Sequence, residues 1–208
     1  MTVDLNNKDI DILAVGKQAL KDGKLLTELL GNLCSKNETI RYNSHKVLFF
    51  LTENHPQKLY PKWDYFLTFL DSDNTYHKLS AVLFLGNLTQ VDKNNKFEKI
   101  FEKYYGLLND KSFIIAAYVC GASGKIAKAK PKLQTKITNL LLDIDKTNHQ
   151  QERIDMVKAS IIDAFGQYYQ QTSNKKRILE FVERQLNCQS PKTRKKAKEF
   201  LKRFNKTG

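Results

Sequence analysis

One helix-sized pattern occurs five times along the chain, and it constrains the fold more than any other feature of the sequence. Apart from Ser123 and Lys198, each copy has an apolar or small pair four and five residues after its first position and an apolar pair seven and eight residues after it; the residue called the ninth position lies nine residues after the first. A helical period of 30 to 45 residues predicts a solenoid, in which stacked helix pairs bury their apolar faces against one another. The ninth positions of the five copies, 34, 38, 42 and 36 residues apart, are Thr52, Gly86, Gly124, Gly166 and Lys202.

The pattern predicts a single all-α domain. Apolar residues recur with a period near 3.6 from end to end, and sustained two-residue alternation is scarce. We expect a right-handed α-α superhelix of about five helix pairs. In this interpretation residues 1–38 form an N-terminal cap pair, residues 39–186 form the repeats, and residues 187–208 form a basic capping helix and tail.

The cysteines and the apolar stretches indicate the compartment. Three cysteines without close neighbours argue against a disulfide framework. The first residues lack the layout of a signal peptide, and the longest apolar stretches are too short to cross a bilayer. We therefore expect a cytoplasmic protein with reduced thiols and no transmembrane segment.

The net charge of +13 is unevenly distributed. Residues 1–104 carry 14 Lys/Arg and 13 Asp/Glu, whereas residues 105–208 carry 21 and 9. Such asymmetry indicates an anionic partner for the second half, which could be nucleic acid, an acidic protein segment or a membrane surface. A lysine-rich surface that only maintains solubility is the alternative, and both interpretations stay open.

The first-helix pattern resembles that of HEAT repeats, roughly Val-Arg-x-x-Ala-Ala-x-Ala-Leu-Gly. The third copy has Ala116 where arginine is usual, and the last copy has Arg194 but lacks the glycine. The resemblance covers about residues 39–204. It implies an armadillo-like fold in which the second helix of each pair lines a concave, partner-binding side. The copies that follow the pattern best contain Val157-Lys158, Ile161-Ile162 and Ala164-Phe165-Gly166, and His77-Lys78, Ala81-Val82 and Phe84-Leu85-Gly86.

Two sets of basic residues are candidates for binding nucleic acid or another anion. If the repeats stack in register, the internal turns of the third and fourth repeats line one edge and form a basic ridge that could follow a phosphate backbone. The alternatives are an ordinary solvated helix face and the polar cap that a terminal repeat needs. The candidates are Lys125, Lys128, Lys132, Lys136, Lys175, Lys176 and Arg177 in the turns, and Lys195, Lys198 and Lys202 on the last helix.

Aromatic residues in one helix are candidates for contact with a protein. Trp63 aligns with the inward residues of that helix, so we expect it in the core. Tyr65 and Phe69 lie four residues apart on a different side and could form an exposed anchor for a peptide or helix. The alternative is a broadly apolar helix that is buried between its neighbours.

Signals for catalysis or metal binding are weak. None of the four histidines lies at metal-ligand spacing from another ligand. The segment Gly121–Lys125 is similar to a phosphate loop, but Ile126 follows the lysine and no strand is predicted before it. Asp143 and Asp145 are interpreted as turn residues, with paired acid–base chemistry as the alternative.

Together these features predict a non-enzymatic scaffold or adaptor. It engages a macromolecular partner along the concave face of the solenoid, and we expect that partner to be a protein. The alternative is DNA or RNA binding by the basic C-terminal half. Some DNA glycosylases are built from similar helices, but no match to their catalytic residues can be placed here, so this activity is a remote third hypothesis. We predict no cofactor, no metal and no small-molecule substrate.

Overall fold

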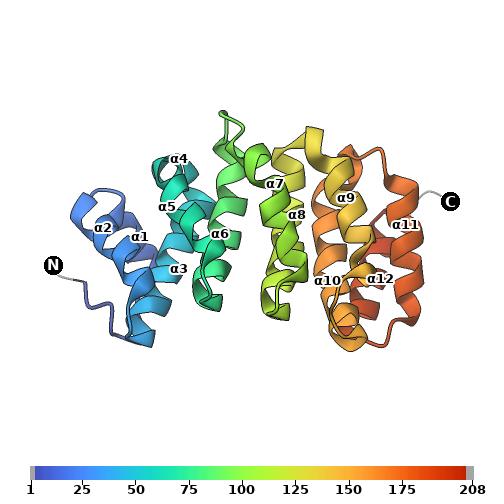
Figure 1. Ribbon diagram of the computed structural model, residues 1–208, viewed down its shortest axis with the longest axis horizontal. Coiled ribbons are helices and arrows are strands. Elements are labelled where there is room, and N and C mark those ends of the chain that lie inside the picture. Colours follow the sequence, from blue (N-terminus) through green and yellow to red (C-terminus); the bar gives the residue numbers. More distant parts are fainter. Residues whose placement is uncertain (1–2, 205–208) are drawn as a thin grey trace. The chain divides into compact units, whose positions relative to one another are not determined.

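The computed structural model describes residues 3–204, and it divides into two compact units, residues 1–94 and 95–208. The last residues of the predicted basic tail, 205–208 with Lys206, lie outside the described residues. No strand occurs among residues 3–204. The described chain is therefore all-α, as its periodicity predicts (Figure 1).

The first unit consists of helices joined by short turns, several of them 3-10. Its α-helices are α1 (Ile12–Ala19), α2 (Gly23–Gly31), α3 (Glu38–Asn54), α4 (Pro56–Leu59), α5 (Trp63–Thr68) and α6 (Thr75–Leu88). Its 3-10 segments are η1 (Asn32–Cys34), η2 (Tyr60–Lys62), η3 (Phe69–Asp71) and η4 (Thr89–Val91).

The second unit repeats the same alternation of long first helices and shorter second helices. Its α-helices are α7 (Lys96–Gly106), α8 (Phe113–Ala129), α9 (Gln134–Leu142), α10 (Gln151–Tyr168), α11 (Lys175–Arg184) and α12 (Pro191–Phe204). Its 3-10 segments are η5 (Leu107–Asn109), η6 (Pro131–Leu133), η7 (Ile144–Lys146), η8 (Tyr169–Gln171) and η9 (Gln185–Asn187).

Local side-chain chemistry determines where several helices begin. The Asp22 carboxylate accepts hydrogen bonds from two backbone N–H groups at the start of α2, and the Asn37 side chain does the same for α3. Such caps satisfy backbone donors that have no partner within the helix. Two arginine side chains instead donate hydrogen bonds from the helix to carbonyl oxygens of the turn before it. Arg41 donates to the Ser35 carbonyl at 2.8 Å and Arg194 to the Cys188 carbonyl at 2.7 Å, which ties the preceding turn to its helix.

The core of the first unit lies where α3 contacts α1 and α6, and α5 contacts α6. Trp63 and Phe66 of α5 are fully buried, and Phe66 meets Phe84 of α6 edge to face at 5.0 Å. The predicted core position of Trp63 is thus confirmed. Aromatic burial of this kind dominates the energetics of small cores.

The core of the second unit is built around α10, which packs against α8 and α12 (Figure 1). Ile161 and Phe165 of α10 are fully buried, and Phe165 contacts Phe181 of α11 edge to face at 5.7 Å. Two buried hydroxyls of this core form a hydrogen bond of 3.2 Å between Tyr105 and Ser123. The Ser123 hydroxyl donates its proton to the Val119 carbonyl, so Tyr105 is the donor to Ser123. The second helices thereby cover the first helices of the same unit.

Gly124 allows α8 and α10 to approach closely. A Cβ at this position would lie 2.8 Å from the Cα of Ala164 and 2.6 Å from the side chain of Gln167. The first of these atoms belongs to the backbone of α10, so it cannot move without shifting the helix. The repeat glycine at this position is therefore explained by helix packing, and the comparison with a phosphate loop is not needed.

We expect Gly124→Ala to lower the free energy of unfolding by roughly 1–3 kcal/mol, because the methyl group overpacks the α8–α10 contact. Gly121→Ala is the matched control in the same helix, since a Cβ there meets nothing within 4 Å. The control should stabilise the protein by roughly 0.5–1 kcal/mol, because alanine favours helix more than glycine does. Urea unfolding of both variants tests this, and equal gains in stability would contradict it.

His45 is a partly buried titratable group in the first unit. Its Nδ1 lies 2.8 Å from the Ser80 hydroxyl, which already donates its proton to the Tyr76 carbonyl. Nδ1 is therefore the donor, and the ring stacks on Phe84 at 5.2 Å. Burial lowers the pKa of His45 to about 4, because the charged ring would lose its hydration.

The lowered pKa predicts acid sensitivity. The unfolded chain, with a histidine pKa near 6.5, binds a proton that the folded protein rejects, so stability is full above that pH and falls as the pH drops toward 4. The loss should reach about 3 kcal/mol. In chemical unfolding at pH 7 and pH 4, His45→Asn should lose that much less stability than the wild type. Parallel losses in both proteins would show that other groups are responsible.

Candidate binding surface

The net charge divides between the two units. Residues 95–208 carry 24 Lys/Arg and 11 Asp/Glu, a net charge of +13, whereas residues 1–94 carry 11 of each and are neutral. The boundary in charge therefore coincides with the structural boundary. All of the excess positive charge belongs to the unit built from α7 to α12.

The predicted basic residues of the repeat turns lie around the ends of α8 and the starts of α9 and α11. The turns from α8 to α9 and from α10 to α11 lie along the same edge of the second unit (Figure 1). Lys125 and Lys128 are in the last turns of α8, Lys132 is in η6 and Lys136 is in α9. Lys175, Lys176 and Arg177 form the first turn of α11.

Two of these residues connect neighbouring second helices. Lys136 of α9 forms an ion pair with Glu102 of α7, and its ammonium group lies 4.4 Å from the centre of the Phe101 ring. Arg177 of α11 donates to the side-chain oxygen of Asn139 of α9 at 2.5 Å. The sequence did not indicate this use, because the partners are 34 and 38 residues away. Both cations therefore contribute to packing between repeats.

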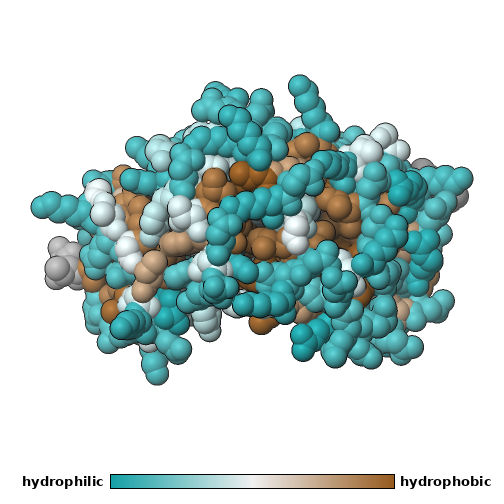
Figure 2. Space-filling view, viewed as in Figure 1, coloured by the Kyte–Doolittle hydropathy of each residue, from teal (hydrophilic) through white to brown (hydrophobic). Residues whose placement is uncertain are grey.

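Other predicted cations remain on the surface. The side chains of Lys175 and Lys176 are exposed, and hydrophilic side chains cover most of α11 in Figure 2. Lys195, Lys198 and Lys202 of α12 are exposed as well. Within residues 3–204 none of these five lysines has an acid at ion-pair distance. Their role in binding an anion stays a prediction.

Cations in the first turn of α11 contradict the usual preference of helices. The N-terminus of a helix carries partial positive charge, so lysine and arginine there are each unfavourable by a few tenths of a kcal/mol to about 1 kcal/mol. Asn174 at the cap position makes no side-chain cap hydrogen bond. This surface therefore combines side-chain cations with the partial positive charge of a helix N-terminus, both of which attract anions.

Lys158 of α10 forms a buried ion-pair network with two carboxylates. Its ammonium group lies 2.7 Å from Asp145 and 3.0 Å from Asp155, and its side chain is 8 % exposed. Burial by itself would lower the pKa of Lys158, but the two carboxylates outweigh burial and raise it. Asp145 is thus part of an ion-pair network, and Asp143 pairs with Lys146 at 2.9 Å.

Phe69 of the candidate aromatic anchor is buried, and Tyr65 is partly buried. Phe69 is 8 % exposed, stacks on His77 at 4.8 Å and meets Tyr65 at 5.1 Å. The Tyr65 hydroxyl donates to the Leu30 carbonyl at 2.9 Å. Of the two interpretations, burial between neighbours therefore applies to Phe69, because its ring packs between those of Tyr65 and His77.

The large apolar side chains with the highest exposed fractions lie outside the candidate anchor. Tyr42 and Tyr76 of the first unit are 60 % and 59 % exposed, and Ile114 and Met156 of the second unit are 54 % and 60 % exposed. All four precede the first position of a repeat copy, so the repeat register itself could have identified them. They lie on the first helices α3, α6, α8 and α10, whereas Tyr65 lies on the second helix α5.

Cys120 is a buried thiol of α8. Burial raises the pKa of the Cys120 thiol to about 12, so this group stays protonated at neutral pH. Within residues 3–204 no three or more His, Cys, Asp or Glu side chains are grouped so that they could hold a metal ion. No helix in the same range is long and apolar enough to span a bilayer.

Comparisons with known proteins show the fold. No family model and no curated protein matches the chain. A designed armadillo repeat protein matches 95 % of this chain over 96 % of its own length, with a TM-score of 0.51 and 14 % identity. An engineered protein of known crystal structure matches 97 % over 92 % of its length, with a TM-score of 0.51 and 13 % identity. The predicted class, an all-α solenoid with an armadillo-like repeat fold, is confirmed.

The two kinds of ion pair should differ in their effect on stability. We expect Lys158→Met to lower the free energy of unfolding by roughly 3 kcal/mol, because Asp155 loses a buried partner. Lys136→Met should cost less than about 1 kcal/mol, because its pair with Glu102 is exposed to water and screened. Thermal or urea unfolding distinguishes the two variants, and comparable losses would show that the Lys158 pair is no more important than a surface pair.

Proposed function

We propose that this protein is a non-enzymatic binding scaffold whose second unit engages an acidic segment of a partner protein along α9 and α11. The observation that carries the proposal is the confinement of the net charge of +13 to residues 95–208. An armadillo-like repeat fold supports it, because stacked second helices form an extended surface that suits a chain-like partner. A cytoplasmic location belongs to the same proposal.

Electrostatics favours such a partner for a physical reason. A surface with one dominant sign of charge raises the rate at which an oppositely charged partner arrives and aligns. Lys175 and Lys176 are exposed at the start of α11, whereas the acids nearest in sequence, Glu180 and Glu183, lie further along the same helix. The basic end of α11 is therefore the part of the surface where we place the acidic residues of the partner.

We further propose that the repeats are of the HEAT type. Lys158 and Arg194 occupy the second position of the first-helix pattern, where the HEAT pattern has arginine. Both contact the turn before their own helix: Lys158 pairs with Asp145 in that turn as well as with Asp155 of α10, and Arg194 donates to the Cys188 carbonyl. Basic residues at this position thus stabilise the turn that joins one pair to the next.

Nucleic acid is the second candidate partner. The basic turns of the third and fourth repeats lie on one edge of the second unit, as a phosphate backbone would require (Figure 1). Binding through phosphates would show little sequence preference and would weaken steeply with salt. Ion pairs such as Lys136–Glu102 neutralise part of that edge, so the acidic protein segment is preferred.

Capture of partners from cell extract, with and without nuclease, separates the two candidates. A protein that stays bound after nuclease treatment supports the scaffold, whereas loss of all bound protein after nuclease indicates nucleic acid. Direct titration with a fluorescent DNA duplex at 50 mM and 200 mM salt then measures the salt dependence. Binding to neither class of partner would contradict both candidates.

The double variant Lys175→Glu with Lys176→Glu should weaken capture of the partner by about ten-fold or more, because it reverses the charge at the start of α11. Lys58→Glu with Lys62→Glu is the matched control, since both lysines are exposed and lie in the neutral first unit. The control changes the net charge by the same amount and should alter binding less than about two-fold. Similar losses in both variants would show that only total charge matters.

A further inference from the structure

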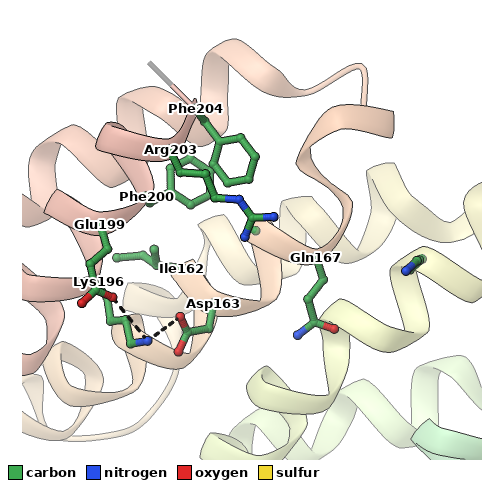
Figure 3. Close-up of a pocket in the computed structure, with 10 residues that line it drawn as sticks. Ile162, Asp163, Gln167, Lys196, Glu199, Phe200, Arg203 and Phe204 are labelled. Carbon is green, nitrogen blue, oxygen red and sulfur yellow. Dashed lines mark ion pairs between the residues drawn. The ribbon is translucent and has the colours of Figure 1, made fainter. Parts of the chain in front are cut away.

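A pocket lies among the first helices of the second unit, on elements that the proposed scaffold role does not use. It has a volume of about 470 Å³, within the range of small-molecule sites. Residues of α8, α10 and α12 line it, and Ile162, Phe200 and Phe204 supply its apolar part (Figure 3). The Tyr169 ring packs against both phenylalanines, with its centre 5.1 Å from that of Phe200 and 4.8 Å from that of Phe204.

Gly166 keeps the pocket open. At the equivalent position of the preceding repeat, Gly124 is required because a Cβ would collide with α10. A Cβ at Gly166 would instead meet Phe204 at 3.8 Å and Phe200 at 4.0 Å, which are ordinary contacts. Glycine within a helix costs about 1 kcal/mol relative to alanine, so packing does not account for it here. Its effect is to leave space beside the two rings.

The charges around the pocket are arranged asymmetrically. Lys196 is paired with Asp163 at 3.0 Å and with Glu199 at 3.6 Å. These three labelled groups lie together in Figure 3, and the guanidinium of Arg203 points into the space between them and Gln167. Their combined charge is negative by one unit, so this end of the pocket does not attract an anion.

Two cations in the pocket lack such partners. Within residues 3–204, neither Lys128 nor Arg203 has a carboxylate at ion-pair distance. The Arg203 guanidinium lies 4.8 Å from the centre of the Phe204 ring, which holds the planar group against the apolar floor. The Gln167 amide, packed over Gly124, adds a polar group to the same lining. An anionic group entering here would meet two positive charges beside an aromatic surface.

We propose that this pocket binds a small organic anion with an apolar body, such as an aromatic carboxylate. The anionic group lies between Lys128 and Arg203, and the apolar body rests on Phe200 and Phe204 beside Gly166. This site is independent of the proposed partner-binding role of α9 and α11, because it is formed by first helices. The chemistry is recognition only, with no bond made or broken.

Fluorescence titration with anilinonaphthalene sulfonate, an aromatic anion whose emission rises in apolar surroundings, tests the site directly. Phenylbutyrate should displace the probe, whereas uncharged phenylbutyramide should displace it about ten-fold less well, because it forgoes the charge-assisted contacts. Arg203→Gln should weaken probe binding by about ten-fold for the same reason. Lys195→Gln, which removes an equal charge from α12 outside the pocket, should leave binding within about two-fold.

Substitution of Gly166 tests the location without removing a charge. Gly166→Leu should abolish probe binding by filling the space beside Phe200 and Phe204. Gly166→Ala should remain folded and be at least as stable as the wild type, which shows that the position tolerates a side chain. Unchanged binding in Gly166→Leu would overturn the proposal, as would an equal loss in Lys195→Gln and Arg203→Gln, or no binding of either anion by the wild type.

Discussion

Close contact between α8 and α10 at Gly124 is the constraint on which the second unit depends. Because the backbone of Ala164 lies where a side chain at Gly124 would be, the two helices are nearer than any larger residue allows. This approach places α10 at the centre of the unit, between α8 and α12. The second helices then join one another through polar contacts such as those of Lys136 and Arg177, which span neighbouring repeats.

Glycine has two different effects in successive repeats. At Gly124 the absence of a side chain lets two helices come into contact, whereas at Gly166 a side chain would fit and its absence leaves space beside two aromatic rings. Charge is divided in a similar way. Lys158 is buried and holds two carboxylates, whereas Lys175 and Lys176 are exposed at a helix end that disfavours them. Gly166, Lys175 and Lys176 are unfavourable in their helical positions, and packing does not explain them. We place ligands at the surfaces that these residues form.

Much of the fold could be predicted from local pattern. Helix starts at Asp22 and Asn37 follow from short polar side chains before an apolar repeat, and the burial of Trp63 follows from its helical phase. For Phe69 the sequence left exposure and burial open. Its burial depends on packing against His77, which no spacing within one helix reveals.

By itself, the sequence determined the helical class, the number and period of the repeats and the concentration of positive charge in the second half, because these depend on residue types at short range. The tertiary structure decided which cations are available. Lys136 and Arg177 are engaged with partners more than 30 residues away, whereas Lys128 and Arg203 line one pocket built from three helices. Such contacts arise only when repeats stack, since the distance between helices is set by packing in space and not by position along the chain.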